Sequence, residues 1–200
     1  MKQSRERFLN MIVGITGGSG AGKSTVSQAF KNKGFVIADG DKISHEILMP
    51  DGVAYKEVVD AFGSMYLNAD KTVNRKKLGK TVFSNPDSLK KLNKIMHFHI
   101  TEIVKSIIKE NKNVVIDGAA LIESKITDLC DDVIYVYCPS EIRIKRIMER
   151  DSISYQDACL RINSQNSDDF YRKHCTYEIV NDGNADTLKQ VEEFLNCSSL

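Results

Sequence analysis

A glycine-rich stretch near the N-terminus constrains this chain more than any other feature of its sequence. The run Gly17-Gly-Ser-Gly-Ala-Gly-Lys-Ser24 fits the pattern G-x-x-x-x-G-K-[ST] at every fixed position. A short apolar run at 11–15 precedes it, and a helical pattern follows over 23–33 and ends at Gly34. This order of strand, loop and helix predicts a phosphate-binding turn at the edge of a parallel sheet.

The residue types in this loop suit a nucleoside triphosphate. Glycines let successive backbone N–H groups turn toward phosphate oxygens, and the following helix adds the partial positive charge of its N-terminus. Lys23 would reach the β- and γ-phosphates of ATP, and the hydroxyl of Ser24 would bind Mg²⁺. The alternative is a turn that binds nothing. The predicted nucleotide-binding residues are Gly17, Gly18, Ser19, Gly20, Ala21, Gly22, Lys23, Ser24 and Thr25.

Strand-like and helix-like patterns alternate along the chain. Further apolar runs predict buried strands at 35–38, 113–117, 132–137 and 178–180. Helical patterns cover 42–62 (interrupted at Pro50-Asp-Gly52), 86–107, 140–150, a segment that begins at Ser154, and 188–195. The alternation predicts an α/β fold in which a doubly wound parallel sheet has helices on both faces, within a single domain over residues 1–200.

Composition argues against several classes of partner. The 28 Lys and Arg residues nearly balance 27 Asp and Glu, and a net charge of +1 does not favour a nucleic-acid or membrane binder. No run approaches about 18 apolar residues, so we expect no transmembrane helix. The five cysteines form no C-x-x-C pair, which predicts reduced thiols and a cytoplasmic protein without structural zinc.

Carboxylates follow the second and third predicted strands, at the edge where doubly wound sheets bind ligands. At strand spacing, Asp39 and Asp41 would share a face and could supply a base for an acceptor hydroxyl or a partner for Mg²⁺. The alternative is a polar turn, and the nearby phosphate loop favours the functional interpretation. Asp117 is either a metal-facing carboxylate or a turn residue, and the sequence does not separate the two.

Three arginines, Arg143, Arg146 and Arg150, lie at i, i+3 and i+7 of the helix after the fourth predicted strand. Guanidiniums on one stripe repel one another unless an anion lies between them, and phosphoryl transfer needs positive charge around the transferred oxygens. We therefore favour a lid over about 142–164. The alternative is a solvated helix with ion pairs to Glu141, Glu149 and Asp151.

Several segments, taken in order, resemble one family over nearly the whole chain. They are Thr16–Thr25, Asp39-Gly-Asp41, Asn74–Leu78 with Val82-Phe83, His97, Arg146 with Arg150-Asp151, Arg161–Gln165 and Ile179–Gly183. The chain resembles the dephospho-CoA kinases, which are P-loop small-molecule kinases. The resemblance implies a P-loop NTPase-like fold with a helical acceptor-binding segment at about 42–110 and a lid at about 142–164.

The resemblance also implies an activity, transfer of the γ-phosphoryl group of ATP, with Mg²⁺, to the 3′-hydroxyl of dephospho-CoA. Asp41 would orient and deprotonate that hydroxyl, with Asp39 as its support. The implied catalytic residues are Asp41, Lys23, Arg146 and Arg150, and the implied acceptor-binding residues are Asp39, Arg75 and His97. Gln165 and Asn181 also match the family, but each could equally cap a helix or a turn.

Departures from the family pattern gather in the segments that would enclose the acceptor. Phe98 replaces a proline, Ala119 stands where proline is usual, and His45 replaces a common arginine. An alternative is therefore a kinase for another small hydroxyl acceptor, such as a nucleoside or a sugar acid. A GTPase switch is less favoured, since Asn93-Lys94 lacks the aspartate of the Asn-Lys-x-Asp guanine motif. We expect a small-molecule substrate, a monomer or small homo-oligomer, and no nucleic-acid or membrane partner.

Overall fold

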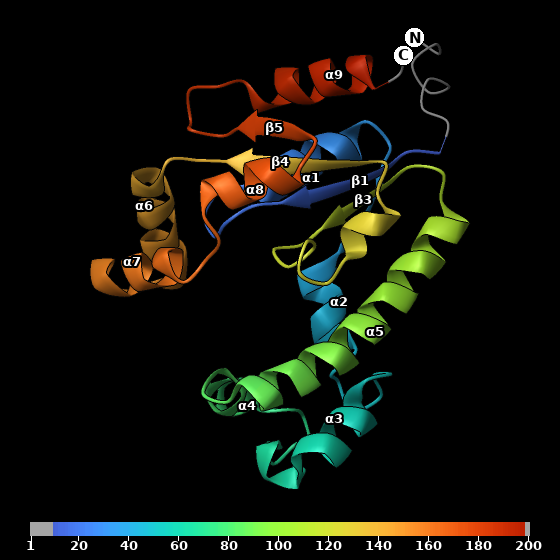
Figure 1. The fold of residues 1–200 in the computed structure, drawn as a ribbon, viewed down its shortest axis with the longest axis vertical. Coiled ribbons are helices and arrows are strands. Elements are labelled where there is room, and N and C mark those ends of the chain that lie inside the picture. The colour runs from blue at the N-terminus through green and yellow to red at the C-terminus, as the bar shows by residue number, and fades with distance from the viewer. Residues whose placement is uncertain (1–9, 199–200) are drawn as a thin grey trace. The chain divides into compact units, whose positions relative to one another are not determined.

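The computed structural model describes residues 10–198 and contains a five-stranded sheet (Figure 1). The strands are β1 (Ile12–Thr16), β2 (Val36–Asp39), β3 (Val114–Asp117), β4 (Asp132–Tyr137) and β5 (Tyr177–Val180), in the order β2-β3-β1-β4-β5. β1 pairs in parallel with β3 and β4, and β4 pairs in parallel with β5. The predicted α/β fold with a parallel sheet is confirmed.

Helices connect the strands, and the chain divides into two compact units. The helices are α1 (Lys23–Asn32), α2 (Gly40–Glu46), α3 (Tyr55–Phe62), α4 (Arg75–Phe83), α5 (Pro86–Glu110), α6 (Ser140–Asp151), α7 (Tyr155–Asn163), α8 (Asp168–His174) and α9 (Thr187–Cys197), with 3₁₀ helices η1 (Ser64–Tyr66) and η2 (Ile126–Leu129). The sheet unit runs up to Ala38 and resumes at Ile108, and the helical unit is Asp39–Ile107. The helical unit has nearly the extent of the segment predicted to bind the acceptor, and that role stays a prediction.

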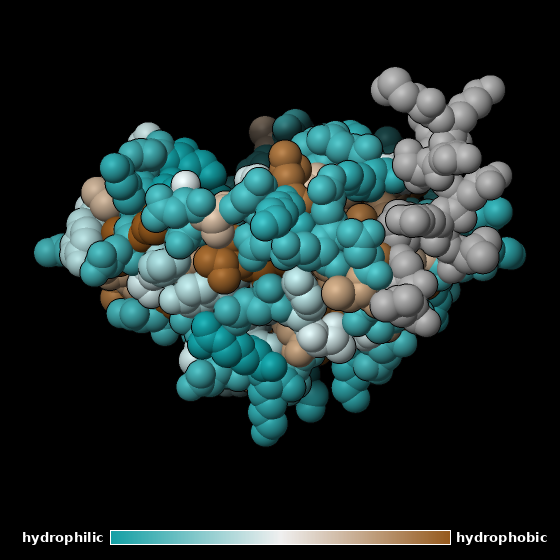
Figure 2. Space-filling view, turned by 90° about the horizontal axis from the view of Figure 1, so that it is seen from above, coloured by the Kyte–Doolittle hydropathy of each residue, from teal (hydrophilic) through white to brown (hydrophobic). Residues whose placement is uncertain are grey.

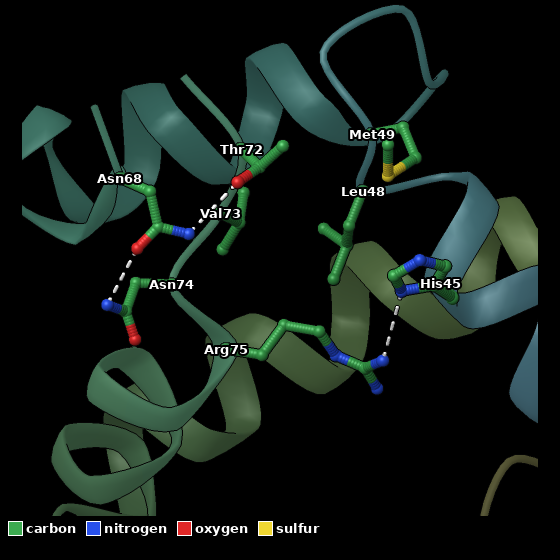
Figure 3. Close-up of a pocket in the computed structure, with 8 residues that line it drawn as sticks. All are labelled: His45, Leu48, Met49, Asn68, Thr72, Val73, Asn74 and Arg75. Atoms are coloured by element: carbon green, nitrogen blue, oxygen red, sulfur yellow. Dashed lines mark hydrogen bonds between the residues drawn. The ribbon is translucent and has the colours of Figure 1, made fainter. Parts of the chain in front are cut away.

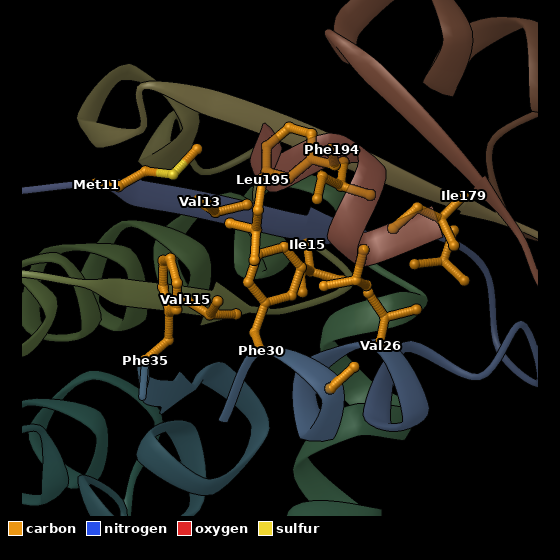
Figure 4. Packing of buried hydrophobic residues seen from close by; sticks show 14 of the residues in the cluster. Met11, Val13, Ile15, Val26, Phe30, Phe35, Val115, Ile179, Phe194 and Leu195 are labelled. Carbon is orange, nitrogen blue, oxygen red and sulfur yellow. The ribbon is translucent and has the colours of Figure 1, made fainter. Parts of the chain in front are cut away.

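Helices cover both faces of the sheet. On one face, Ile134 of β4 joins a buried cluster with Phe30 of α1 and Phe194 of α9, whose ring centroids lie 5.9 Å apart (Figure 4). On the other face, Tyr135 stacks on Tyr171 of α8 with ring centroids 4.9 Å apart. Because side chains alternate across a strand, a parallel sheet with two apolar faces needs helices on both.

The helical unit has a smaller apolar interior. Its buried hydrophobic residues are Ile43, Ile47, Leu48, Ala54, Val58, Val73, Leu78, Val82 and Val104. Over its 25 residues, all of them described, α5 buries Val104 alone. Met65, Phe83 and Phe98 are 62%, 78% and 60% exposed. Several large apolar side chains of this unit therefore remain in contact with solvent.

Two helices, α4 and α8, lie outside the individual helical patterns predicted from the sequence, although α4 falls within the segment at about 42–110 that the family resemblance implied to be helical. α4 follows Asn74, whose side chain accepts a hydrogen bond from the N–H of Lys77. α8 follows Ser167, which accepts one from the N–H of Phe170. Asn and Ser are favoured N-caps because their oxygens satisfy N–H groups that the first helical turn leaves unpaired. Both capping signals are present in the sequence.

The expectation that Asp39 and Asp41 share a face at strand spacing is wrong. β2 ends at Asp39 and α2 begins at Gly40, so Asp41 lies in the first turn of a helix. Asp39 is the N-cap of α2 and accepts a hydrogen bond from the N–H of Lys42 at 3.0 Å. Both carboxylates suit the positive end of the helix dipole, so the sequence forms a strand-to-helix junction.

The face drawn in Figure 2 is mostly hydrophilic, with hydrophobic residues dispersed over it in small groups. Scattered exposed apolar residues of this kind are ordinary for a protein surface.

Within residues 10–198, no helix combines the length and the apolarity needed to cross a bilayer.

Candidate active site

The glycine-rich loop joins β1 to α1 and leaves the N-terminus of α1 without a side-chain cap. Gly22 is the N-cap, with a φ of 88°, and the first turn of α1 contains no acidic residue. An uncapped helix N-terminus presents N–H groups and a partial positive charge. This part of the sheet unit therefore has the geometry of an anion-binding site.

Two glycines of the loop allow side chains from distant segments to approach closely. A Cβ on Gly18 would lie 2.1 Å from Nη2 of Arg143, and a Cβ on Gly22 would lie 1.9 Å from Nδ2 of Asn181. Atoms cannot approach so closely, so any other residue at these positions would displace its neighbour. The two glycines therefore give Arg143 and Asn181 room to reach the loop.

Arg143 and Gln165 hold the first half of the loop. Arg143 of α6 donates from Nε to the carbonyl of Ser19 at 2.9 Å and from Nη2 to Oε1 of Gln165 at 2.6 Å. Oε1 of Gln165 also accepts from the N–H of Ser19 at 3.1 Å, and its Nε2 donates to Oγ of Ser19 at 2.8 Å. From the sequence, Gln165 could have been either a family site residue or a cap of a helix or turn. In the structure it contacts the loop directly.

Arg146 and Asn181 hold the second half of the loop. Nη1 of Arg146 donates to the carbonyls of Gly20 and Asn181, each at 3.2 Å. The buried Asn181, which follows β5, donates from Nδ2 to the carbonyl of Ala21 at 2.9 Å. α6 and the end of β5 thus fix the loop on the side that leads into α1.

The side chains predicted to meet ATP and Mg²⁺ lie at the start of α1. Nζ of Lys23 donates to the carbonyl of Gly17 at 3.0 Å, and Ser24 is exposed. Asp117, at the end of β3, accepts a hydrogen bond from Oγ of Ser27 at 2.6 Å. A hydroxyl and a carboxylate fit Mg²⁺, which keeps water and phosphate oxygens as its other ligands. Residues 10–198 contain no cluster of three or more His, Cys, Asp or Glu that could hold a metal by itself.

The three arginines of the predicted stripe have different partners within the protein. Arg143 and Arg146 contact the loop, whereas Arg150 donates from Nε and Nη2 to the carboxylate of Asp151 at 2.7 and 2.9 Å. Arg161 of α7 donates to the same carboxylate. The hydrogen bonds from Arg150 and Arg161 lower the pKa of Asp151 to about 2. This pairing links α6 to α7, within the predicted lid.

The helical unit has a pocket of its own, with a volume of about 360 Å³ (Figure 3). Nη1 of Arg75 lies 3.4 Å from Nδ1 of His45 on its wall. A guanidinium, amides and apolar side chains together suit a ligand with anionic and apolar parts. Of the residues predicted to bind the acceptor, Arg75 lines this pocket, and Asp39 and His97 do not. The lining residues are His45, Leu48, Met49, Asn68, Thr72, Val73, Asn74 and Arg75.

Comparison with known proteins assigns the chain to a family. The family model for dephospho-CoA kinase matches residues 11–187. The chain belongs to the dephospho-CoA kinase family. A dephospho-CoA kinase of Carboxydothermus hydrogenoformans is 41% identical over 159 residues, which are 77% of each chain. One of Arabidopsis thaliana is 37% identical over 184 residues, which are 90% of this chain and 79% of its own.

Solved structures extend the comparison to the fold. The dephospho-CoA kinase from Campylobacter jejuni has a TM-score of 0.65 at 29% identity and covers 94% of this chain and 96% of its own. TT1252 from Thermus thermophilus has a TM-score of 0.82 at 24% identity, over 95% of this chain and 98% of its own. Shikimate kinase from Acinetobacter baumannii has a TM-score of 0.57 at 17% identity, over 97% of this chain and 96% of its own. The last two show the fold alone. Membership of the dephospho-CoA kinase family confirms the resemblance drawn from the ordered motifs.

Within this dephospho-CoA kinase fold, Arg143 lies outside the residues that the sequence assigned to nucleotide binding. It nevertheless donates a hydrogen bond to a loop residue 124 positions away in the chain. The sequence signal that could have pointed to Arg143 was the spacing of the three arginines on α6. That spacing showed that they share a face of the helix, but not which of them is buried against the loop.

Proposed function

We propose that the chain transfers the γ-phosphoryl group of ATP to the 3′-hydroxyl of dephospho-CoA, giving CoA and ADP. A bond forms between the hydroxyl oxygen and the γ-phosphorus, the bond from that phosphorus to ADP breaks, and the hydroxyl proton is released. The observation that carries the proposal is the uncapped N-terminus of α1 behind a glycine-rich loop, in a member of the dephospho-CoA kinase family.

The loop residues 17–25 would hold the triphosphate of ATP. Lys23 would exchange its hydrogen bond to Gly17 for a phosphate oxygen, which an ammonium on a flexible stem can do. Ser24 would bind Mg²⁺, and Asp117 is the carboxylate at the adjoining strand end that could support it. Bound Mg²⁺ would neutralise charge on the phosphates.

Asp41 is the proposed base, and its place in α2 gives Asp39 a defined supporting role. As the N-cap, Asp39 fixes the first turn of the helix that carries Asp41. Arg146 and Arg150 are the proposed cations around the transferred group. Arg150 would reach it by loosening its pair with Asp151, which is an exposed contact of modest strength.

The acceptor is proposed to bind the helical unit. Arg75 and His45 in the pocket supply a cation and an imidazole for polar parts of the acceptor, and apolar neighbours such as Leu48 suit its less polar parts. His97 of α5 and Asp39 complete the proposed acceptor set. The partner is then a small molecule rather than nucleic acid or membrane, and we propose a cytoplasmic monomer or small homo-oligomer.

An assay of ADP release across acceptors tests this function. We expect dephospho-CoA to be phosphorylated with a much higher kcat/KM than a panel of nucleosides and sugar acids, and with ATP in preference to GTP. The product should carry the phosphate on the 3′-oxygen, as phosphorus NMR can show. Faster transfer to a nucleoside or a sugar acid would replace the proposal by the alternative kinase.

A further inference from the structure

Arg143 carries a buried positive charge with neutral partners. It is 5% exposed, and its hydrogen bonds go to the carbonyl of Ser19 and the amide oxygen of Gln165. Across residues 10–198, the arginines that form ion pairs are Arg150, Arg161 and Arg172. A buried guanidinium without a carboxylate costs free energy, because it loses its hydration and gains no opposite charge.

The position of this charge suggests what it is for. Nη2 lies so close behind the loop that a Cβ on Gly18 would be 2.1 Å from it. The two hydrogen bonds use two of the five N–H donors of a guanidinium. One of these hydrogen bonds reaches Ser19, and the other reaches Gln165, which itself contacts Ser19. Ser19 lies in the first half of the loop proposed to surround the phosphates of ATP.

We propose that the phosphates of the bound nucleotide are the missing counter-charge of Arg143. Arg143 is then a positioning residue that holds Ser19 and Gln165 and attracts phosphate through the loop. The free protein bears the cost of the buried charge, and nucleotide binding offsets it. This inference rests on the proposed function only in requiring that the loop binds a nucleotide, and it does not depend on the acceptor.

Gln165→Glu is the sharpest test, because a glutamate can keep every contact of Gln165. One carboxylate oxygen can accept from Arg143 and from the N–H of Ser19, and the other can accept from the Ser19 hydroxyl once that hydroxyl turns to donate. The variant therefore adds a carboxylate partner beside Arg143. Gln28→Glu is the matched control, since Gln28 is exposed on α1 and donates to Asn32.

We expect Q165E to melt about 2–4 °C higher than the parent without ligand, because the buried charge gains a partner. By calorimetry it should bind ADP about tenfold more weakly, since the carboxylate cancels the attraction for phosphate. The decrease of ADP affinity with salt concentration should also become shallower. Q28E should match the parent in all three measurements.

A second pair of variants removes the charge itself. Arg143→Met should weaken ADP binding about tenfold relative to Arg172→Met, because Arg172 already pairs with Glu178. The rise in melting temperature on adding ADP should be smaller for R143M than for R172M.

Two results would overturn the inference. One is an ADP affinity for Q165E within twofold of the parent, and the other is a lower melting temperature for Q165E with unchanged salt dependence, which would make Arg143 a structural contact. Turnover with dephospho-CoA is measured on the same proteins. A parent that binds ADP but does not phosphorylate dephospho-CoA would overturn the proposed function, while the ADP affinities would still decide the role of Arg143.

Discussion

The phosphate loop and the pocket of the helical unit differ in how firmly their arginines are held. Around the loop, Arg143, Gln165 and Asn181 make hydrogen bonds of 2.6 to 3.1 Å to loop residues or to one another. In the pocket, Asn68 donates to Thr72 at 2.9 Å and Asn74 donates to Asn68 at 2.8 Å, but the exposed Arg75 only approaches His45, at 3.4 Å. A triphosphate presents the same charges at every turnover, so a rigid cradle suits it, and preorganised charge is what phosphoryl transfer requires. An acceptor with apolar and polar parts can be bound by a surface that adjusts around it.

Removing Lys23, the cation of the phosphate loop, should have the largest effect on activity. Lys23→Ala should lower kcat/KM by about 10⁴, because phosphoryl transfer depends on charge stabilisation of the transferred group. Lys23 is half-buried at the start of α1 and lies outside the apolar core, so circular dichroism and the melting temperature should remain close to those of the parent. Turnover within a few-fold of the parent would show that the loop is not the phosphate site.

The next effect is expected at the first turn of α2. Asp41→Asn should lower kcat by about 10² to 10⁴, the usual range for loss of a general base. The KM for ATP should change little, because the loop lies in the other unit and keeps its own contacts. Steady-state kinetics with both substrates varied would measure this split.

Asp39→Asn is the matched control for Asp41. Asparagine is as good an N-cap as aspartate, so α2 should persist and kcat should fall much less than in Asp41→Asn. A larger loss at Asp39 would mean that the base is the capping residue. Partial recovery of the Asp41→Asn variant at high Mg²⁺ would assign Asp41 to metal support instead.

The two units should also differ in stability when aromatic residues are shortened. Phe30 packs between Phe35 and Phe194 in the sheet unit, so Phe30→Ala should cost about 3–5 kcal/mol of unfolding free energy. Phe98→Ser in the helical unit should stay within about 0.5 kcal/mol, because Phe98 is 60% exposed. Urea unfolding of the two variants measures both values. A similar cost at both positions would remove the contrast in packing.

A variant in the pocket should have a smaller effect, which appears in acceptor binding and not in the rate of phosphoryl transfer. Arg75→Met should raise the KM for dephospho-CoA about tenfold while kcat stays near the parent value, as for a contact equally strong in the ground and transition states. The KM for ATP should not change. A fall in kcat with an unchanged KM for dephospho-CoA would move Arg75 from the acceptor to the transferred phosphoryl group.

The sequence was informative wherever one local pattern decided the structure. The apolar run before Gly17 and the glycine motif predicted β1, the loop and the start of α1. The helical pattern that begins at Pro86 predicted α5. α4 and α8 were missed although capping residues stand before both, because short polar helices lack a clear apolar period. The Asp-Gly-Asp junction was misjudged since glycine can end a strand or begin a helix, and an acidic N-cap resolved it as a helix.

The candidate site needed contacts that no local pattern contains. Gln165 and Asn181 reach Ser19 and Ala21 across 146 and 160 positions. Such contacts arise only in the tertiary fold, where the end of β5, two strands away from β1, and the segment after α7 both reach the loop. The stripe of arginines on α6 was visible, but which guanidinium is buried depends on the space left by a glycine in the loop.

The smallest effect on stability is expected at the link between α6 and α7. This link is made by exposed charges, whereas the contacts around the loop are buried. Hydrogen bonds from Arg150 and Arg161 lower the pKa of Asp151 from 3.8 to about 2. A carboxyl group with a lowered pKa in the folded state stabilises the fold above its unfolded pKa, and that contribution is lost as the pH falls through about 2. At pH 7, Asp151→Asn should therefore lower the melting temperature only slightly, because the pair is partly exposed. Carbon NMR of the Asp151 carboxyl should give a midpoint near 2 in the parent and a higher one in Arg161→Met, where one donor is lost. A parent midpoint at the ordinary value of an aspartate would show that the pair does not persist in solution, so that the charged link between α6 and α7 would contribute nothing to the predicted lid.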